Sequence, residues 1–211
     1  EKPGAVHIEL PEDIAKLEVG KEPLPVHKFR RSVPDPEVIE QTYARIKAAK
    51  TPIILAGNGC IRRRASEQLR ILCEKTGIGV LSTFMAKGCV DMDADYCMYT
   101  IGLGARDIPA CAIEAADLII SIGFDMVEYH PKLWNDGNNT EVLHIDFLPA
   151  EIDENYHPEI EVVGDIAHAL EMLNEKIEQG PALALDLSSQ KKMRETMMAE
   201  LAIHKDDAGE G

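Results

Sequence analysis

The chain has 211 residues, of which 45% are hydrophobic and 28% charged, and its formal net charge is −15. This size and composition suit one globular domain with attached segments. The negative charge argues against binding to nucleic acid or to an anionic membrane surface, and no apolar run approaches the ~20 residues that span a bilayer. The five cysteines form no Cys-x-x-Cys pair, so zinc has no support, and reduced thiols in a cytoplasm are expected.

The first part of the chain contains one candidate strand and a proline-rich stretch. Residues 5–10 have the sequence Ala-Val-His-Ile-Glu-Leu, which predicts a strand. No partner strand is near, and such an edge needs covering, so we expect the chain to be a piece of a longer protein. Residues 14–34 contain Pro23, Pro25 and Pro34 and no periodicity, which is typical of an interdomain linker.

Regular structure is predicted to begin with a helix near residue 35. Asp35 is a good N-cap, and Pro36 is tolerated at the first helical position. Ile39, Tyr43 and Ile46 then recur at spacings of four and three, which indicates a helix lying on a core.

Apolar runs alternate with helical patterns in the rest of the chain. Several of these runs are apolar throughout, as in a parallel sheet covered on both faces, so the predicted class is α/β. A polar helix is expected beyond residue 182, and residues 83–104 give no clear pattern. We expect strands at 53–56, 78–82, 118–122, 142–145 and 160–163 and helices at 62–76, 105–116 and 165–180.

Turns rich in glycine and acidic residues follow these strands. In an open parallel sheet such turns meet at one edge, and ligands bind there. This edge, which we call the rim, is predicted from the turns at 57–59, 82–85, 102–104, 123–125, 146–147 and 164–165. The candidate cofactor-binding residues are Gly57, Asn58, Gly59, Thr83, Phe84, Met85, Gly102, Leu103, Gly104, Gly123, Asp125, Asp146, Phe147 and Asp165.

The turn at residues 56–59, Ala-Gly-Asn-Gly, carries the strongest local signal. It has the strand–turn–helix order of a nucleotide-binding unit, whose first helical N–H groups attract an anion. The fingerprint lacks its third glycine, and any βα unit can use glycine to turn tightly. Residues 62–64 are three arginines that oppose the helix dipole. They contact a phosphate, pair with acidic groups of a neighbouring domain or subunit, or point into solvent.

The acidic residues at and near the rim are candidates for functional or for structural roles. Asp125 and Glu128 are candidates for acid–base chemistry, or they hold the loop at 124–139 together. Asp146 could accept a ribose hydroxyl or cap the next turn, and Asp165 suits a helix cap. Since no nucleophile or metal-ligand spacing accompanies them, no catalytic residue and no metal ligand are predicted.

Several segments together resemble the central domain of thiamine-diphosphate-dependent enzymes of the acetolactate synthase type. Residues 125–135 are similar to a segment of the catabolic, flavin-independent acetolactate synthases, and residues 4–13 resemble the last strand of the family's preceding pyrimidine-binding domain. The resemblance covers about residues 3–180. Its other motifs are at 56–59, 115–123 (Ala-Ala-Asp-Leu-Ile-Ile-Ser-Ile-Gly), 142–146 (Val-Leu-His-Ile-Asp) and 162–165 (Val-Val-Gly-Asp).

The resemblance implies a Rossmann-like, doubly wound, mostly parallel sheet of six strands. Residues 1–13 would end the pyrimidine-binding domain, 14–34 would be a linker, 35–180 the central domain, and 181–211 would lead to a C-terminal cofactor-binding domain. Thiamine diphosphate and Mg²⁺ would lie between the outer domains of a homodimer or homotetramer. The whole enzyme would condense two pyruvates to 2-acetolactate, towards branched-chain amino acids or acetoin, whereas this fragment alone would be inactive.

The resemblance bears on flavin as well. Flavin-binding relatives carry Gly-Ala-Arg-Phe-Asp-Asp-Arg where residues 123–129 are Gly-Phe-Asp-Met-Val-Glu-Tyr. Both arginines are absent and Asp125 and Glu128 would repel a diphosphate, so FAD is not expected, and the cleft would be filled by side chains such as Phe84, Met85 and Phe147. The alternatives are a pyruvate oxidase or decarboxylase domain, a free-standing FAD- or NAD-binding module, and a purely structural spacer.

Overall fold

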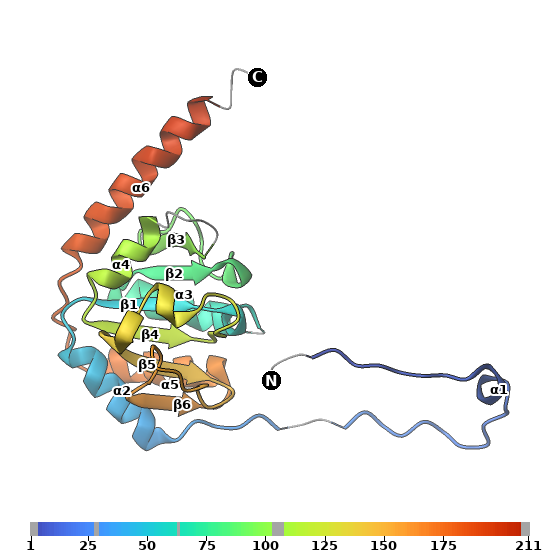
Figure 1. Cartoon of the computed structure of the whole chain (residues 1–211). Helices are drawn as coiled ribbons and strands as arrows, with labels where there is room; N and C mark the ends of the chain where they lie inside the picture. Colours follow the sequence, from blue (N-terminus) through green and yellow to red (C-terminus); the bar gives the residue numbers. More distant parts are fainter. Residues whose placement is uncertain (1–3, 28–29, 63, 103–107, 208–211) are drawn as a thin grey trace.

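A parallel sheet of six strands forms the centre of the computed structural model, which describes residues 4–27, 30–62, 64–102 and 108–207 (Figure 1). The strand order β3-β2-β1-β4-β5-β6 reverses between β1 and β4, as in doubly wound Rossmann-like folds, and all the pairings are parallel. The predicted class is therefore confirmed. The strands are β1 (Pro52–Ala56), β2 (Val80–Thr83), β3 (Cys97–Ile101), β4 (Leu118–Ile122), β5 (Glu141–Asp146) and β6 (Ile160–Val163).

Helices and short 3-10 turns alternate with these strands. The Asp35 side chain caps α2 by accepting the Glu37 N–H at 2.9 Å, and Gly77 ends α3 with a φ of 72°. The helices are α1 (Glu12–Ala15), α2 (Pro36–Ala48), α3 (Ala65–Thr76), α4 (Cys111–Glu114), α5 (Ile166–Gln179) and α6 (Ser188–Asp207), and the 3-10 turns are η1 (Asn58–Ile61), η2 (Phe84–Ala86), η3 (Ile108–Ala110), η4 (Pro131–Leu133) and η5 (Asp136–Asn138).

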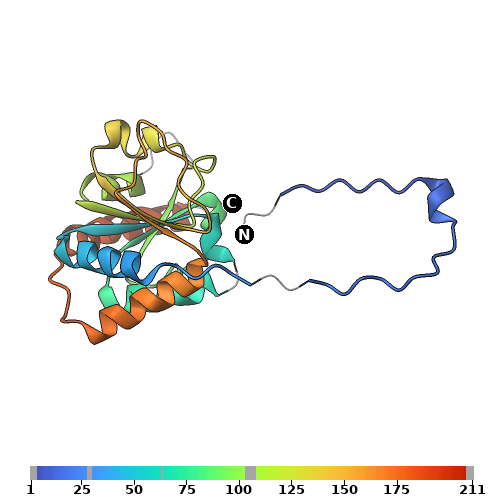
Figure 2. The same ribbon diagram turned by 90° about the horizontal axis from the view of Figure 1, so that it is seen from below.

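The sheet is buried on both faces. Helices α2, α3 and α5 pack on one face, where they meet Ile54 and Ala56 of β1. Helix α4, the loop at 124–139 and part of α6 pack on the other, where they meet Ile53 and Leu55 (Figure 2). Because successive side chains of a strand point to opposite faces, double burial explains why β1 is apolar throughout.

The middle of the chain differs from the sequence-based expectations at three places. Strand β3 lies within the stretch that gives no clear pattern; Tyr99 has a φ of 64° and the register with β2 shifts between Val80 and Ser82, so pairing rather than local pattern defines this strand. The helix expected from residue 62 begins at Ala65, because the 3-10 turn η1 comes first. The helix expected at 105–116 is reduced, within the described residues, to η3 and α4.

The expected strand at residues 5–10 is also wrong. No described segment pairs with it, and a strand exists only where its backbone groups find a partner. Val6 and Ile8 are 83% and 84% exposed, in a segment that extends away from the sheet and returns through α1 (Figures 1 and 2). No helix among the described residues is both long and apolar enough to cross a membrane.

Helix α6 begins against the edge of the sheet opposite the rim, where β1, β2 and β3 start. The buried Gln190 side chain accepts the Gly79 N–H at 2.9 Å and donates to the Pro52 carbonyl at 2.7 Å. The Arg194 guanidinium, 8% exposed, donates from Nε to the carbonyls of Ala94 and Cys97, both at 3.1 Å. These contacts join the first half of α6 to the sheet.

Candidate functional site

The rim brings together five of the predicted cofactor-binding residues around one small cavity. This cavity has a volume of about 60 Å³, enough for about two water molecules at ~30 Å³ each. Sequence reasoning had not assigned a ligand role to His144 or Tyr156, which also line it together with Arg62. The predicted residues in its wall are Asn58, Gly59, Gly123, Asp125 and Asp146.

The glycines of the rim serve close packing between two turns. A Cβ on Gly57 would lie 2.4 Å from the Gly123 carbonyl oxygen, and a Cβ on Gly59 would lie 2.5 Å from the Gly123 Cα. Gly123 itself has a φ of 60°, a conformation that residues with a Cβ rarely adopt. The turn after β1 and the turn after β4 therefore touch through their backbones, which leaves no room between them for a ligand.

The N–H groups of the first turn are already used within the protein. Gly57 donates to the Ile122 carbonyl at 2.9 Å, Gly59 to the Gly123 carbonyl at 2.8 Å, and Cys60 to the Gly57 carbonyl at 2.9 Å. A diphosphate at a nucleotide-binding turn needs such donors free. In this turn they hold the strand ends together.

The remaining donor of the turn, the Asn58 N–H, binds the Glu128 carboxylate. Its nitrogen lies 3.0 Å from Oε1 and 3.2 Å from Oε2 of Glu128, and the buried Thr83 hydroxyl donates to Oε2 as well. The Asp125 carbonyl accepts the Glu128 N–H at 2.9 Å, and the Asp125 side chain accepts the Val127 N–H at 3.2 Å, so a tight turn aims Glu128 inward. An acidic side chain of the protein thus uses the remaining donor of the turn.

The surroundings of Glu128 act on its ionisation in opposite directions. Glu128 is 9% exposed, and this burial raises the pKa of its carboxyl, as does the nearby charge of Asp125. The hydrogen bonds from Thr83 and Asn58 and the positive charge of Arg62 act to lower the same pKa, but the effect of burial is larger and the pKa is raised overall. Both carboxylate oxygens accept hydrogen bonds, which fits the ionised form.

A chain of buried polar side chains forms another wall of the cavity. The Tyr156 hydroxyl donates to the Ser121 hydroxyl at 2.9 Å, and His144 Nδ1 lies 2.8 Å from the same Tyr156 oxygen. His144 Nε2 lies 3.1 Å from the Leu148 carbonyl, so both ring nitrogens have partners. Burial raises the pKa of the neighbouring Asp146, although His144 and nearby N–H groups act in the opposite direction. This wall is a structural network in which His144 is held in place, as expected for a structural histidine.

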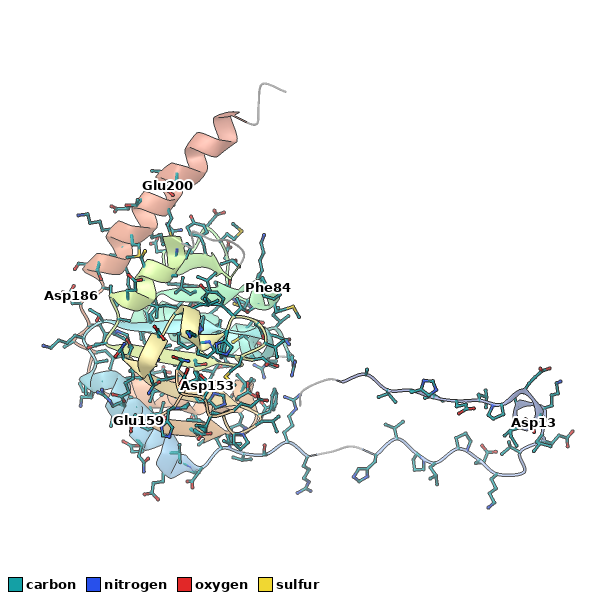
Figure 3. The ribbon with its side chains drawn as sticks, viewed as in Figure 1. Asp13, Phe84, Asp153, Glu159, Asp186 and Glu200 are labelled. Atoms are coloured by element: carbon teal, nitrogen blue, oxygen red, sulfur yellow. The ribbon has the colours of Figure 1, made fainter. Side chains whose placement is uncertain are left out.

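The side chains expected to fill the cleft lie elsewhere. Phe84 and Met85 are 39% and 48% exposed, and Phe84 points away from the sheet at the rim (Figure 3). Phe147 packs against the core on the α2, α3 and α5 side. That expectation is corrected for Phe84 and Met85, because the polar donors of the turn favour a carboxylate over an apolar side chain, and Glu128 supplies it.

The other predicted residues of the rim have structural partners or lie outside the described part. Gly102 has a φ of 93° and faces the Tyr129 ring, which a Cβ would approach to 3.3 Å. Leu103 and Gly104 fall outside the described residues.

Asp165 does not line the cavity. Its carboxylate caps α5 by accepting the His168 N–H at 3.0 Å and forms an ion pair with Arg31, while its own N–H donates to the Ser32 carbonyl at 3.0 Å. Gly164 beside it packs closely on Pro34. This acidic residue therefore fastens the end of the N-terminal segment to the rim.

The arginines that the structure describes among residues 62–64 lie in different surroundings. Arg62 lines the cavity, whereas Arg64 is exposed and pairs with Glu67 of its own helix at 3.0 Å. Residue 63 lies outside the described part. Such an exposed pair contributes little to stability.

The cavity at the rim is too small for the large cofactors that such a rim would suggest. Ligand pockets for molecules of that size are typically about 300–1,000 Å³, far above the cavity at the rim. A larger cavity of about 720 Å³ lies at the opposite edge, but the four carboxylates in its wall outnumber its two cations, Arg70 and Lys191, and oppose a diphosphate. No group of three or more His, Cys, Asp or Glu side chains in the described part could hold a metal ion. The carboxylates are those of Glu74, Asp91, Asp93 and Asp95.

Comparison with known proteins identifies the family to which this chain belongs. Residues 39–173 match the family model of the thiamine pyrophosphate enzyme central domain. The chain is 34% identical over 176 residues to a probable acetolactate synthase large subunit of Methanococcus aeolicus, covering 78% of this chain and 29% of that protein. It is 32% identical over 203 residues to a catabolic acetolactate synthase of Raoultella terrigena, covering 93% of this chain and 36% of that protein.

A third relative gives the same picture. The acetolactate synthase of Bacillus subtilis is 34% identical over 131 residues, which are 62% of this chain and 23% of that enzyme. The chain thus spans about a third or less of the length of these curated relatives. With its Rossmann-like sheet and the matched residues 39–173, the chain belongs to the thiamine pyrophosphate enzymes, of which it forms the central domain.

Proposed function

We propose that this chain is the central, structural domain of an acetolactate synthase that works without FAD. In the whole protein, two pyruvate anions and one proton would give one 2-acetolactate anion and one carbon dioxide. Thiamine diphosphate and Mg²⁺ would be held by the domains on either side, which supply the carbanion chemistry. The observation that carries the proposal is the match to a catabolic acetolactate synthase along 93% of the chain.

The geometry of the rim supports a structural role. The first turn has its donors used internally, and the cavity beside it is small and lined by three carboxylates and one arginine. The chain would then space and orient two catalytic domains, within a homodimer or homotetramer in a cytoplasm. Residues 4–13 would belong to the preceding domain, and residues 14–34 would link that domain to this one. Contacts of Asp165 and Gly164 with Ser32 and Pro34 hold the end of this linker on the central domain.

A domain exchange tests the assignment to acetolactate synthases. Residues 35–180 would replace the aligned segment of the Raoultella terrigena enzyme, and acetolactate formation from pyruvate would be measured with thiamine diphosphate and Mg²⁺ present. We expect activity in the exchanged enzyme and none in the 211-residue chain alone. An exchanged enzyme that folds and assembles but makes no acetolactate would count against the proposal, as would turnover by the isolated chain.

A titration tests the absence of flavin. The 211-residue chain would be titrated with FAD and with ADP, and binding would be followed by calorimetry and by flavin fluorescence. Because the Asn58 N–H and its neighbours already have acceptors, we expect no heat of binding and no quenching. Micromolar affinity for either compound would overturn the flavin-free reading and leave the acetolactate synthase assignment standing.

A further inference from the structure

Three strand ends of the rim are joined by a single carboxylate. Glu128 follows β4, the Asn58 N–H that it accepts lies in the turn after β1, and the Thr83 hydroxyl that it accepts lies at the end of β2. Asn58 and Thr83 are 70 and 45 residues away from Glu128 along the chain. A contact of this kind fixes three turns relative to one another.

The burial of this charge needs a physical reason. A carboxylate loses hydration when it is buried, which is unfavourable unless hydrogen bonds replace the lost water. Glu128 is 9% exposed and receives a backbone N–H and a hydroxyl, while Arg62 adds a favourable charge and Asp125 an unfavourable one. These donors are the groups that a bound oxyanion would use, so the site has the chemistry of an anion site with its anion covalently attached.

We infer that the Glu128 carboxylate is an internal ligand that takes the place of a bound anion and holds the ends of β1, β2 and β4 together. The inference rests on the proposed flavin-free function, because a nucleotide at this turn would compete for the same donors. It implies a latent site: if the Glu128 side chain were shortened, the Asn58 N–H and the Thr83 hydroxyl would be free to donate to a small external oxyanion such as formate or phosphate.

Chemical rescue tests the latent site. The 211-residue chain would be compared with its Glu128→Ala variant by thermal unfolding in sodium chloride, sodium formate and sodium phosphate at equal ionic strength. We expect the variant in chloride to unfold about 5–10 °C below the parent, because buried donors lose a charged acceptor. Formate at about 0.1 M should restore a large part of this difference by binding only the folded state, with phosphate acting less because it is larger, and the parent should not respond.

Matched variants separate the proposal from general effects. Glu154→Ala removes an exposed glutamate and should unfold with the parent in every salt. Glu128→Gln keeps the shape and should fold, but it removes the negative charge and leaves one acceptor oxygen in place of two, so the bond from the Asn58 N–H weakens and hydrogen exchange at the Asn58 amide should become faster. This readout replaces thermal rescue if the alanine variant does not fold.

Two outcomes would overturn the inference. One is an unchanged unfolding temperature in Glu128→Ala together with unchanged Asn58 exchange in Glu128→Gln. The other is recovery in formate no greater than in chloride, which would mean that screening rather than site binding acts. Neither result depends on acetolactate formation or FAD titration, so failure of this inference is distinguishable from failure of the proposed function.

Discussion

The two edges of the sheet are held by side chains of opposite character. At the rim, where the strands end, the Glu128 carboxylate accepts from the Asn58 N–H and the Thr83 hydroxyl. At the opposite edge the Arg194 guanidinium donates to backbone carbonyls, and the Gln190 amide binds one N–H and one carbonyl. In both places a buried polar side chain from a distant part of the chain satisfies main-chain groups.

The difference between the edges lies in what each could otherwise bind. The rim offers donors, so its natural occupant is an anion, and a glutamate supplies the charge. The opposite edge offers carbonyls of the segment before β3, and a guanidinium with five N–H groups matches several of them at once. Each edge is therefore satisfied by side chains of the complementary hydrogen-bonding type.

The backbone contact at the rim should be the most sensitive point. In Gly123→Ala a Cβ would lie 2.6 Å from the Gly59 Cα, at a φ of 60°. We expect a loss of about 3–5 kcal/mol in the free energy of unfolding, measured with urea, because backbone cannot move aside as a side chain can.

The matched control for this variant is Gly88→Ala. Gly88 has a φ of 93°, but nothing lies within 4 Å of the position that a Cβ would take there, so this variant isolates the cost of the backbone conformation. We expect about 1 kcal/mol there. Equal losses at Gly123 and Gly88 would contradict the close packing of the two turns.

The guanidinium at the opposite edge should come next. Arg194→Ala removes a buried donor to the carbonyls of Ala94 and Cys97, of which the Ala94 carbonyl keeps the Cys97 N–H, so we expect a loss of about 2–4 kcal/mol in urea unfolding. Arg64→Ala is the control, because it breaks only the exposed pair with Glu67 and should change the free energy of unfolding little. A small loss in Arg194→Ala would mean that α6 is not anchored by this side chain.

A second carboxylate of the rim, that of Asp146, is partly buried, and its pKa is raised like that of Glu128. Burial raises the pKa of Asp146, so the folded protein holds this proton more tightly than the unfolded chain, and its contribution to stability falls as the pH rises through the folded pKa. We expect Asp146→Asn to be more stable than the parent at neutral pH by up to about 1 kcal/mol, with the difference vanishing below about pH 4. Urea unfolding across this range checks the sign, and a destabilised variant at neutral pH would contradict it.

Elements with a strong local pattern could be predicted from the sequence. The Asp35 cap, the Pro36 start and the apolar stripe of α2 are local features, and so is the glycine that ends α3. Strands β1 and β4 can be recognised from their continuous apolar sequences, which arise because both of their faces are buried. Strand β3 could not be found in this way, since Tyr99 and the register shift interrupt its pattern and only pairing with β2 defines it.

The sequence predicted that the turns of the rim meet at one edge of the sheet, but it did not predict which groups contact each other there. The turns at Gly57, Gly59 and Gly123 do meet at one edge, as parallel strands require. Their glycines, however, serve contact with each other, which depends on the separation between two turns that are far apart in sequence. Glu128 was expected to repel a ligand or to hold its own loop, and its bonds to Asn58 and Thr83 could not be read from spacing.

The sequence by itself determined the α/β class, the direction of the strands and the edge at which their turns meet, because burial patterns and glycine positions act over a few residues. Only the tertiary structure decided which groups occupy that edge. Hydrogen bonds such as those of Glu128 and Arg194 join residues 45–101 positions apart, and packing of the whole chain sets those distances.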